Sequence, residues 1–328
     1  MPSSKNKFQT TLLTRLNKLP EIALSLFALA FLAGCCSKFG WLCNLPSHFV
    51  LQFAALFFLT TSLFLLKRKY AYSFISFALF VTSMSQLAPY LIQNSQANLS
   101  ASANAITIKF LQLNVFKHNP DLPRLSSVIR NENADLLSME EFNDRISEEL
   151  KSTHALDQYP YCIITPNDSK DSEIALFSKH PITSYHVEHA PTEGDASIIA
   201  QIAFESSKSL TVIIMHPRPP ATAKFLERQE AQFSSIAKSY SNIDVPVIVA
   251  GDLNTTPWAQ PYKDFVSSMH LVDPRIGRGL MPSWPTYFPL LAIPIDHILC
   301  SKNIRISALK TGDFTGSDHL PLLLEFSL

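Results

Sequence analysis

Three apolar stretches in the first hundred residues constrain this chain more than any other feature. They cover residues 22–36, 49–66 and 70–92, and the last two contain no charged side chain. A bilayer core about 30 Å thick requires about 20 residues of helix to cross it. We therefore predict an N-terminal bundle of about three transmembrane helices within residues 1–92.

The basic residues around these stretches predict their orientation. Four lie before the first stretch and three more, at residues 67–69, separate the second from the third, whereas Lys38 is alone in the loop between the first two. Positive charge close to a span favours the cytoplasmic side. The N-terminus is therefore expected on the cytoplasmic side of the membrane, and three spans place everything after residue 92 on the opposite side.

The segment Leu32-Ala33-Gly34-Cys35 allows a different topology because it is similar to a lipoprotein cleavage site. Cleavage there would leave two spans and return the C-terminal part to the cytoplasm. The roughly 20 residues before the apolar stretch are long for such a signal.

The five cysteines include no CxxC pair, so they indicate neither a zinc site nor a disulfide framework.

Charge divides the chain near residue 100. Residues 1–105 contain eight Lys/Arg and one acid, which leaves 19 basic and 26 acidic residues, a net charge of −7, for residues 106–328. A domain of that sign has no general attraction for nucleic acid. We expect a transmembrane region at 1–92, a polar tether at 93–105 and a soluble domain at 106–328.

The C-terminal part alternates short β-branched or apolar runs with amphipathic stretches, a pattern typical of one α+β domain. Its predicted strands are 106–115, 136–139, 174–177, 198–204, 210–215, 245–250, 295–300 and 320–326, and its predicted helices are 122–131, 144–152, 221–239 and 262–268.

Polar side chains suited to metal binding or proton transfer recur where these strands end. Each alone is more often a turn former. Their recurrence after successive apolar runs instead predicts a site at one edge of a sheet, built from loops and strand ends. These residues are Asn114, Glu141, His216, Asp252, Asn254 and Asp296.

The last element is Ser317-Asp318-His319, directly before the final strand. The carboxylate of Asp318 can serve a divalent metal, while the imidazole of His319 handles a proton or a developing charge. Asp296 is a suitable carboxylate partner for His319.

Seven short segments of the C-terminal part contain these polar residues and the apolar runs around them: LNV at 113–115, ADLLSMEE at 134–141, IALFSK at 174–179, MHP at 215–217, GDLN at 251–254, IDHI at 295–298 and SDHLP at 317–321. Together these segments resemble the endonuclease/exonuclease/phosphatase superfamily, the DNase I-like enzymes, over residues 106–328. Within it, the chain is similar to bacterial membrane members of the YafD-like and vancomycin-resistance type, through residues 141–143, 216–220 and 256–258.

The resemblance implies a four-layer α/β/β/α sandwich with a divalent metal, Mg²⁺ or alternatively Mn²⁺. Glu141 would bind the metal directly, with Asn114 and Asp318 nearby; relatives often have Gln where this chain has Glu140, so Glu140 stays open as the ligand. The resemblance assigns the other roles as follows: Asp252 orients or deprotonates the attacking water, Asn254 and His216 hold the phosphoryl oxygens, and His319, supported by Asp296, completes the site.

We therefore expect a membrane-anchored metal-dependent hydrolase acting on a phosphodiester or phosphomonoester. An acidic domain tethered to a lipid bilayer favours a small or lipid-linked ester. The superfamily also keeps a nuclease open as an alternative, and a tethered domain that only binds, or confers resistance without catalysis, is the non-enzymatic one.

Overall fold

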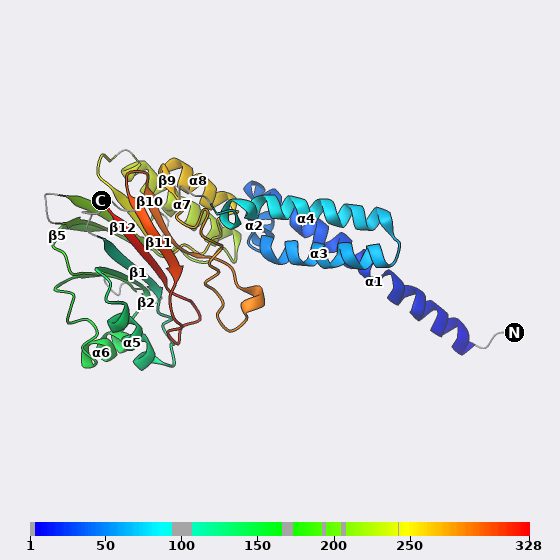
Figure 1. Ribbon diagram of the computed structural model, residues 1–328, viewed down its shortest axis with the longest axis horizontal. Coiled ribbons are helices and arrows are strands. Elements are labelled where there is room, and N and C mark those ends of the chain that lie inside the picture. The colour runs from blue at the N-terminus through cyan, green and yellow to red at the C-terminus, as the bar shows by residue number, and fades with distance from the viewer. Residues whose placement is uncertain (1–3, 94–106, 166–172, 192–194, 205–207, 242) are drawn as a thin grey trace. The chain divides into compact units, whose positions relative to one another are not determined.

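The computed structural model describes every residue except 1–3, 94–106, 166–172, 192–194, 205–207 and 242 (Figure 1). The chain forms two compact units, Met1–Ala88 and Pro89–Leu328. Almost all of the predicted tether at 93–105 lies outside the described residues.

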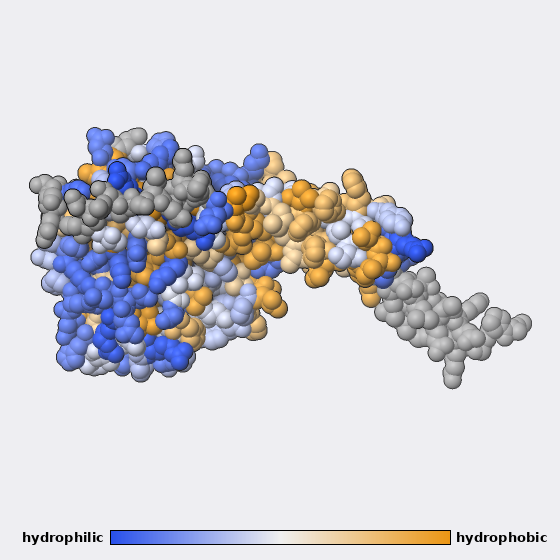
Figure 2. Space-filling view, in the orientation of Figure 1, coloured by the Kyte–Doolittle hydropathy of each residue, from blue (hydrophilic) through white to orange (hydrophobic). Residues whose placement is uncertain are grey.

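The first unit is helical, as the apolar stretches predict, and hydrophobic residues predominate on the part of its surface that is coloured in Figure 2. Residues Lys18–Cys35 and Tyr70–Leu91 are long and apolar enough to cross a membrane. A third span exists if α2 and α3, which are bent by 67° at their junction, count as one. The helices are α1 (Ser4–Cys35), the 3₁₀ helix η1 (Ser37–Phe39), α2 (Trp41–Ser47), α3 (Val50–Leu66) and α4 (Tyr70–Leu91).

Aromatic side chains join these helices. Phe31 of α1 packs edge-on against Phe53 and Phe57 of α3, with ring centroids 5.6 and 5.4 Å away. Glu21, the single acid of the N-terminal region, forms an ion pair with Lys69 in the turn between α3 and α4. The one negative charge of this region is therefore matched within the unit.

The second unit contains two six-stranded mixed sheets. The first has the strand order β11-β12-β1-β2-β4-β3 and the second β5-β6-β7-β8-β10-β9. The strands are β1 (Ile108–Asn114), β2 (Leu136–Phe142), β3 (Tyr161–Ile164), β4 (Glu173–Ser178), β5 (Ile182–His189), β6 (Ala196–Ala203), β7 (Ser209–Met215), β8 (Val247–Asp252), β9 (Leu271–Val272), β10 (Asp296–Ser301), β11 (Arg305–Thr311) and β12 (Leu322–Ser327).

Side-chain alternation along the strands builds four layers. In β1, Ile108 and Phe110 face the apolar core shared with the second sheet, whereas Leu111 and Leu113 pack under the helices of the first. This arrangement confirms the expected α/β/β/α sandwich. Helices α5 (Leu122–Glu132) and α6 (Asp144–Ser152) cover the first sheet, and α7 (Ala223–Tyr240) and α8 (Gln260–Ser268) cover the second.

All eight predicted strands and all four predicted helices of this unit are present. The predicted start of the first strand, Ile106, lies outside the described residues, and β1 begins at Ile108. The sequence does not predict β3, β5, β9 or β11. Side chains cap three of the helices, since Asp121, Asn143 and Thr222 accept backbone N–H groups at the starts of α5, α6 and α7.

Strand direction decides where the polar strand ends meet. β1 runs parallel to β2 and β7 parallel to β8, so each pair ends at one edge. β10 and β12 run antiparallel to β8 and β1, so they begin at that same edge. In the β8–β10 register, Asp252 lies opposite Asp296.

Candidate active site

The polar site residues continue the inward-facing rows of apolar side chains. Ile248 and Ala250 of β8 face the core between the sheets, and Asp252 is the next inward position of the same strand. The same spacing carries β7 from Ile214 to His216, directly beyond its end. The site is therefore the polar end of the core between the sheets.

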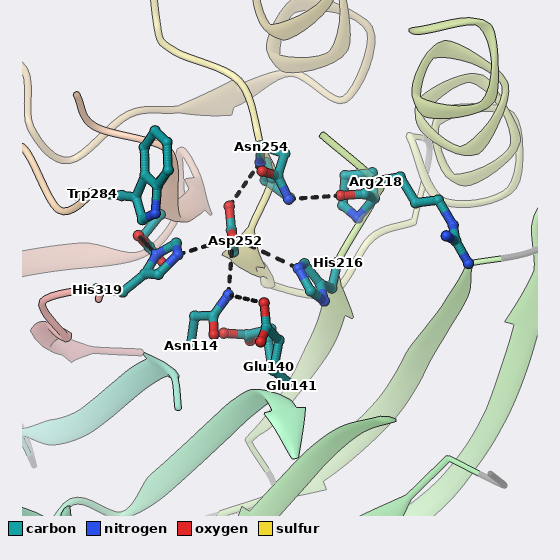
Figure 3. A network of polar contacts seen from close by, with 12 residues as sticks. Asn114, Glu140, Glu141, His216, Arg218, Asp252, Asn254, Trp284 and His319 are labelled. Atoms are coloured by element: carbon teal, nitrogen blue, oxygen red, sulfur yellow. Dashed lines mark hydrogen bonds and ion pairs between the residues drawn. The ribbon is translucent and has the colours of Figure 1, made fainter. Parts of the chain in front are cut away.

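Asp252 lies at the centre of the site (Figure 3) and is buried. Its Oδ2 accepts a hydrogen bond from Asn114 Nδ2 at 3.1 Å and lies 3.6 Å from His216 Nε2 and 3.7 Å from His319 Nε2. Its Oδ1 accepts the backbone N–H of Asn254 at 2.9 Å. Burial raises the pKa of Asp252 to about 6, against the opposing effect of the neighbouring imidazoles.

His319 is held between two carboxylates. Its Nδ1 donates to Asp296 Oδ2 at 2.8 Å, and its Nε2 faces Asp252. Burial opposes charge on the ring, but Asp296 and Asp252 outweigh burial and raise the pKa of His319 to about 10. Burial likewise opposes charge on Asp296, yet His319 holds the pKa of that carboxyl below its ordinary value. Asp296 and His319 therefore form a buried pair in which each side chain stabilises the opposite charge on the other.

Gln112 links the two sheets beneath the site. Its Nε2 donates to Glu140 Oε2 at 2.7 Å and to Asp296 Oδ1 at 2.9 Å. Glu140 is fully buried, and its Oε1 has no hydrogen-bond partner among the described residues. Burial, with the nearby carboxylates of Asp296 and Asp252 adding to it, raises the pKa of Glu140 well above its ordinary value.

A bulge in β2 turns Glu141 toward the site. The register with β4 shifts between Glu140 and Phe142, and Glu141 takes a left-handed φ of 58°. Simple alternation would place Glu141 on the helix-covered face with Met139. Instead, its Oε2 accepts the backbone N–H of Lys117 at 3.0 Å, and its Oε1 lies 3.4 Å from Asn114 Nδ2.

The opposite wall consists of His216 and Asn254. Asn254 has φ 50° and donates through Nδ2 to the Pro217 carbonyl at 2.9 Å, which fixes the two loops to one another. Arg218 belongs to this loop, but its guanidinium points away from Asp252 (Figure 3), and its Nε lies 3.2 Å from Asp195 Oδ1.

Asp318 lies beside His319 at the rim. Its Oδ2 accepts the indole N–H of Trp284 at 3.1 Å, and the Trp284 ring centroid is 6.4 Å from that of His319. Ser317 Oγ donates to the Asn114 carbonyl at 2.7 Å and accepts the backbone N–H of His319. The final polar motif is therefore fixed directly onto the end of β1.

These donors fit a divalent metal. In the described part of the chain, Asp252, Asp296 and His319 could hold an ion, because one ligand atom of each lies within 4.8 Å of the others. Glu141 and Asn114 offer further hard oxygen atoms on the other side of Asp252, the type that Mg²⁺ prefers.

Residues 111–319, close to two thirds of the chain, match the sequence profile of the Endonuclease/Exonuclease/phosphatase family. The chain belongs to this family. It is thus a metal-dependent hydrolase of phosphate esters, and the matched segment contains all eight site residues predicted from the sequence.

Solved structures share the fold at low sequence identity. An endonuclease/exonuclease/phosphatase from Beutenbergia cavernae is 20% identical with a TM-score of 0.52, covering 68% of this chain and 72% of its own. A family protein from Bacteroides thetaiotaomicron reaches 0.59 at 16% identity, covering 68% and 98%. A mannosyl-6-phosphatase from Bacteroides thetaiotaomicron reaches 0.55 at 17%, covering 67% and 100%. Among curated proteins, no significant match is found.

Three further residues of the site are not among the eight predicted from the sequence. Gln112 is the inward residue that precedes Asn114 in β1, Ser317 orients the final motif, and Trp284 holds Asp318. Only Gln112 carries a signal, namely an amide at an inward position of an otherwise apolar strand. The other two depend on contacts between distant loops.

Proposed function

We propose that this protein is a Mg²⁺-dependent phosphoesterase anchored in the bacterial inner membrane, with its hydrolase domain outside the cytoplasm. The observation that carries the proposal is Asp252, buried between two imidazoles and an amide at the end of the core between the sheets. The candidate spans support the anchor, and the distribution of basic residues supports the orientation.

Glu141 is the proposed direct metal ligand, with Asn114 and Asp318 nearby. The hydrogen-bonded His319–Asp296 pair satisfies its own charges at 2.8 Å, which favours the Glu141 side of Asp252 for the ion. When bound, Mg²⁺ would neutralise the charge on phosphoryl and leaving oxygens. Mn²⁺ accepts the same oxygen donors.

The remaining proposed roles follow from whether each side chain can donate or accept a proton or a hydrogen bond. Asp252 is the proposed group that orients or deprotonates the attacking water, since it is the carboxylate at the centre. His216 and Asn254 would hold phosphoryl oxygens from the opposite wall. His319, supported by Asp296, would bear a proton or stabilise developing charge beside them.

We also propose membership of the YafD-like, vancomycin-resistance-type subgroup. Two of the three segments that carry this resemblance lie at the site, because residues 141–143 contain Glu141 and the loop at 216–220 contains His216. The third, residues 256–258, follows the site residue Asn254.

Hydrolysis of bis-p-nitrophenyl phosphate and p-nitrophenyl phosphate by the full-length protein in detergent tests the activity. We expect turnover with Mg²⁺, loss with EDTA, recovery on adding Mg²⁺ or Mn²⁺, and loss in Asp252→Asn. A DNA and RNA panel examines the nuclease alternative, which the acidic domain disfavours. If wild type and Asp252→Asn are equally inert on every substrate, the non-catalytic alternative replaces this proposal.

A further inference from the structure

A loop beside the site exposes an unusual number of large apolar side chains. We define residues 286–292 as the apolar loop; in Figure 1 it is the orange segment that carries the short helix η4 (Pro289–Leu291). Leu290 is 92% exposed and Phe288 65%, and Tyr287 and Leu291 are also exposed. Residues 281–295 contain no charged side chain. Single exposed apolar residues are ordinary, but such a cluster marks an interaction surface.

The exposure is built into the fold, since the base of the loop is fixed. Thr286 donates its backbone N–H to the Asp318 carbonyl at 2.9 Å and its hydroxyl to the Ser317 carbonyl at 3.0 Å. Tyr287 donates its hydroxyl to the Gly316 carbonyl at 3.3 Å. These bonds connect the base of the apolar loop to residues 316–318, directly before His319, so the loop lies beside the site.

A cation adjoins the same surface. Tyr287 packs edge-on against Phe314, and the guanidinium of Arg124 lies 5.5 Å from the Phe314 ring centroid. Arg124 also pairs with Asp121, and half of its side chain stays exposed. Aromatic and aliphatic tips next to arginine are typical of segments that enter the headgroup region of a bilayer.

Chain length keeps this surface near a membrane. Sixteen residues separate the end of α4 at Leu91 from the start of β1 at Ile108. Such a segment reaches no more than about 60 Å when fully extended. The hydrolase domain therefore cannot diffuse away from the bilayer that holds the spans, and a bilayer is the apolar phase always available to the loop.

We propose that the apolar loop inserts into the lipid–water interface and that the substrate is a phosphate ester carried by a membrane lipid. This inference rests on the proposed phosphoesterase function. Insertion would place the entrance to the site at headgroup level, where a lipid phosphate can reach Asp252 and His319 while its acyl chains stay in the membrane.

Insertion can be measured without any activity. A photoreactive benzoylphenylalanine replaces Leu290 in the full-length protein, reconstituted in phosphatidylcholine vesicles with phosphatidylglycerol. The matched control carries the same group at Tyr185, an exposed aromatic residue of the edge strand β5. We expect lipid adducts at 290 and none at 185. Adducts to a second copy of the chain, or no lipid adducts at 290, would overturn insertion.

The substrate class is tested with one headgroup in two physical forms. Dioleoyl and dihexanoyl versions of phosphatidic acid and phosphatidylglycerol supply it in the bilayer and as free monomers, and bis-p-nitrophenyl phosphate reports the basal reaction. We expect Leu290→Glu to lower hydrolysis of a dioleoyl lipid about tenfold while the soluble diester is cleaved as before, and Tyr185→Glu to change neither.

The outcomes separate the two proposals. Turnover of the soluble diester without turnover of any lipid, or equal loss on both in Leu290→Glu, contradicts the lipid substrate and leaves the phosphoesterase standing. A wild-type protein that cleaves none of these compounds contradicts the phosphoesterase itself, whatever the lipid adducts show.

Discussion

At the scale of single residues, two adjacent glutamates occupy opposite environments because of one bulge. Glu140 continues the inward row of β2 and is fully buried beneath the site, whereas the left-handed backbone at Glu141 turns the next carboxylate to the solvent-accessible side. A non-glycine residue with positive φ is uncommon, and such residues occur preferentially at functional sites.

The geometry favours Glu141 as the metal ligand. We expect Glu141→Gln to raise the Mg²⁺ concentration needed for half-maximal activity at least about tenfold, because the amide replaces a charged oxygen donor. A Mg²⁺ titration of activity measures this, with Glu148→Gln on the exposed face of α6 as the matched control. An unchanged titration would contradict the assignment.

Glu140 should behave in the opposite way. Glu140→Gln keeps the side-chain shape while removing a carboxyl group that is buried among other carboxyls and leaves one oxygen without a partner. We expect the free energy of unfolding to rise by about 1 kcal/mol with the Mg²⁺ requirement unchanged. Denaturant unfolding measures the stability of Glu140→Gln, and a Mg²⁺ titration of its activity measures the metal requirement. Weakened metal binding in Glu140→Gln would identify Glu140 as the ligand.

His319 should be required for turnover but not for folding. We expect His319→Ala to lower kcat by about 10² or more, because the imidazole is the proposed group that exchanges a proton or bears charge beside Asp252. His154→Ala, at an exposed histidine paired with Asp157, is the matched control. Thermal melts of both variants separate lost chemistry from lost structure, and full activity in His319→Ala would refute the role.

At the scale of elements, the close approach of β7 and β8 depends on one glycine. Gly251 has φ +139°, and a Cβ added there would lie 1.9 Å from the Met215 carbonyl oxygen. We expect Gly251→Ala to destabilise the domain by more than about 3 kcal/mol, measured by denaturant unfolding.

Gly279 provides the matched control for this prediction. It has a similar φ of +122° but nothing within 4 Å of an added Cβ, so Gly279→Ala carries only the backbone strain. The two variants should therefore differ clearly in stability. Equal stabilities would mean that the contact between β7 and β8 yields more easily than the structure indicates.

The elements that sequence reasoning finds are those whose side chains are buried. β7 and β8 are buried and mainly apolar, so His216, directly beyond β7, and Asp252, the last residue of β8, stand out as site candidates. β5 and β11 are partly exposed strands with mixed side chains, so no periodic signal marks them. The bulge at Glu141 depends on pairing with β4, which local sequence does not specify.

At the scale of the whole molecule, the number of spans decides on which side the hydrolase acts. α3 has 17 residues, about 26 Å of helix, and reaches the thickness of a bilayer core only together with the bent α2. Three spans place the hydrolase opposite the N-terminus, while two place both on the same side.

A reporter fused after Ile92 tests the orientation. We expect an alkaline phosphatase fusion, which folds only outside the cytoplasm, to be active, because the basic residues favour the cytoplasmic side for the N-terminus and for the turn at residues 67–69. A green fluorescent protein fused at the same point is the complementary control. A silent phosphatase with a bright fluorescent fusion would place the domain in the cytoplasm.

The pairing of β12 with β1 has a consequence for biosynthesis. β1 is synthesised early, but its pairing partner β12, which lies between β11 and β1, is synthesised late. His319 directly precedes β12 in the chain, so it is also synthesised late. A nascent chain thus emerges from the ribosome with its hydrophobic helices far ahead of a working catalyst. Premature termination before Leu322 would leave β1 without its partner β12 and release an inert product, so hydrolysis begins only after β12 has been synthesised.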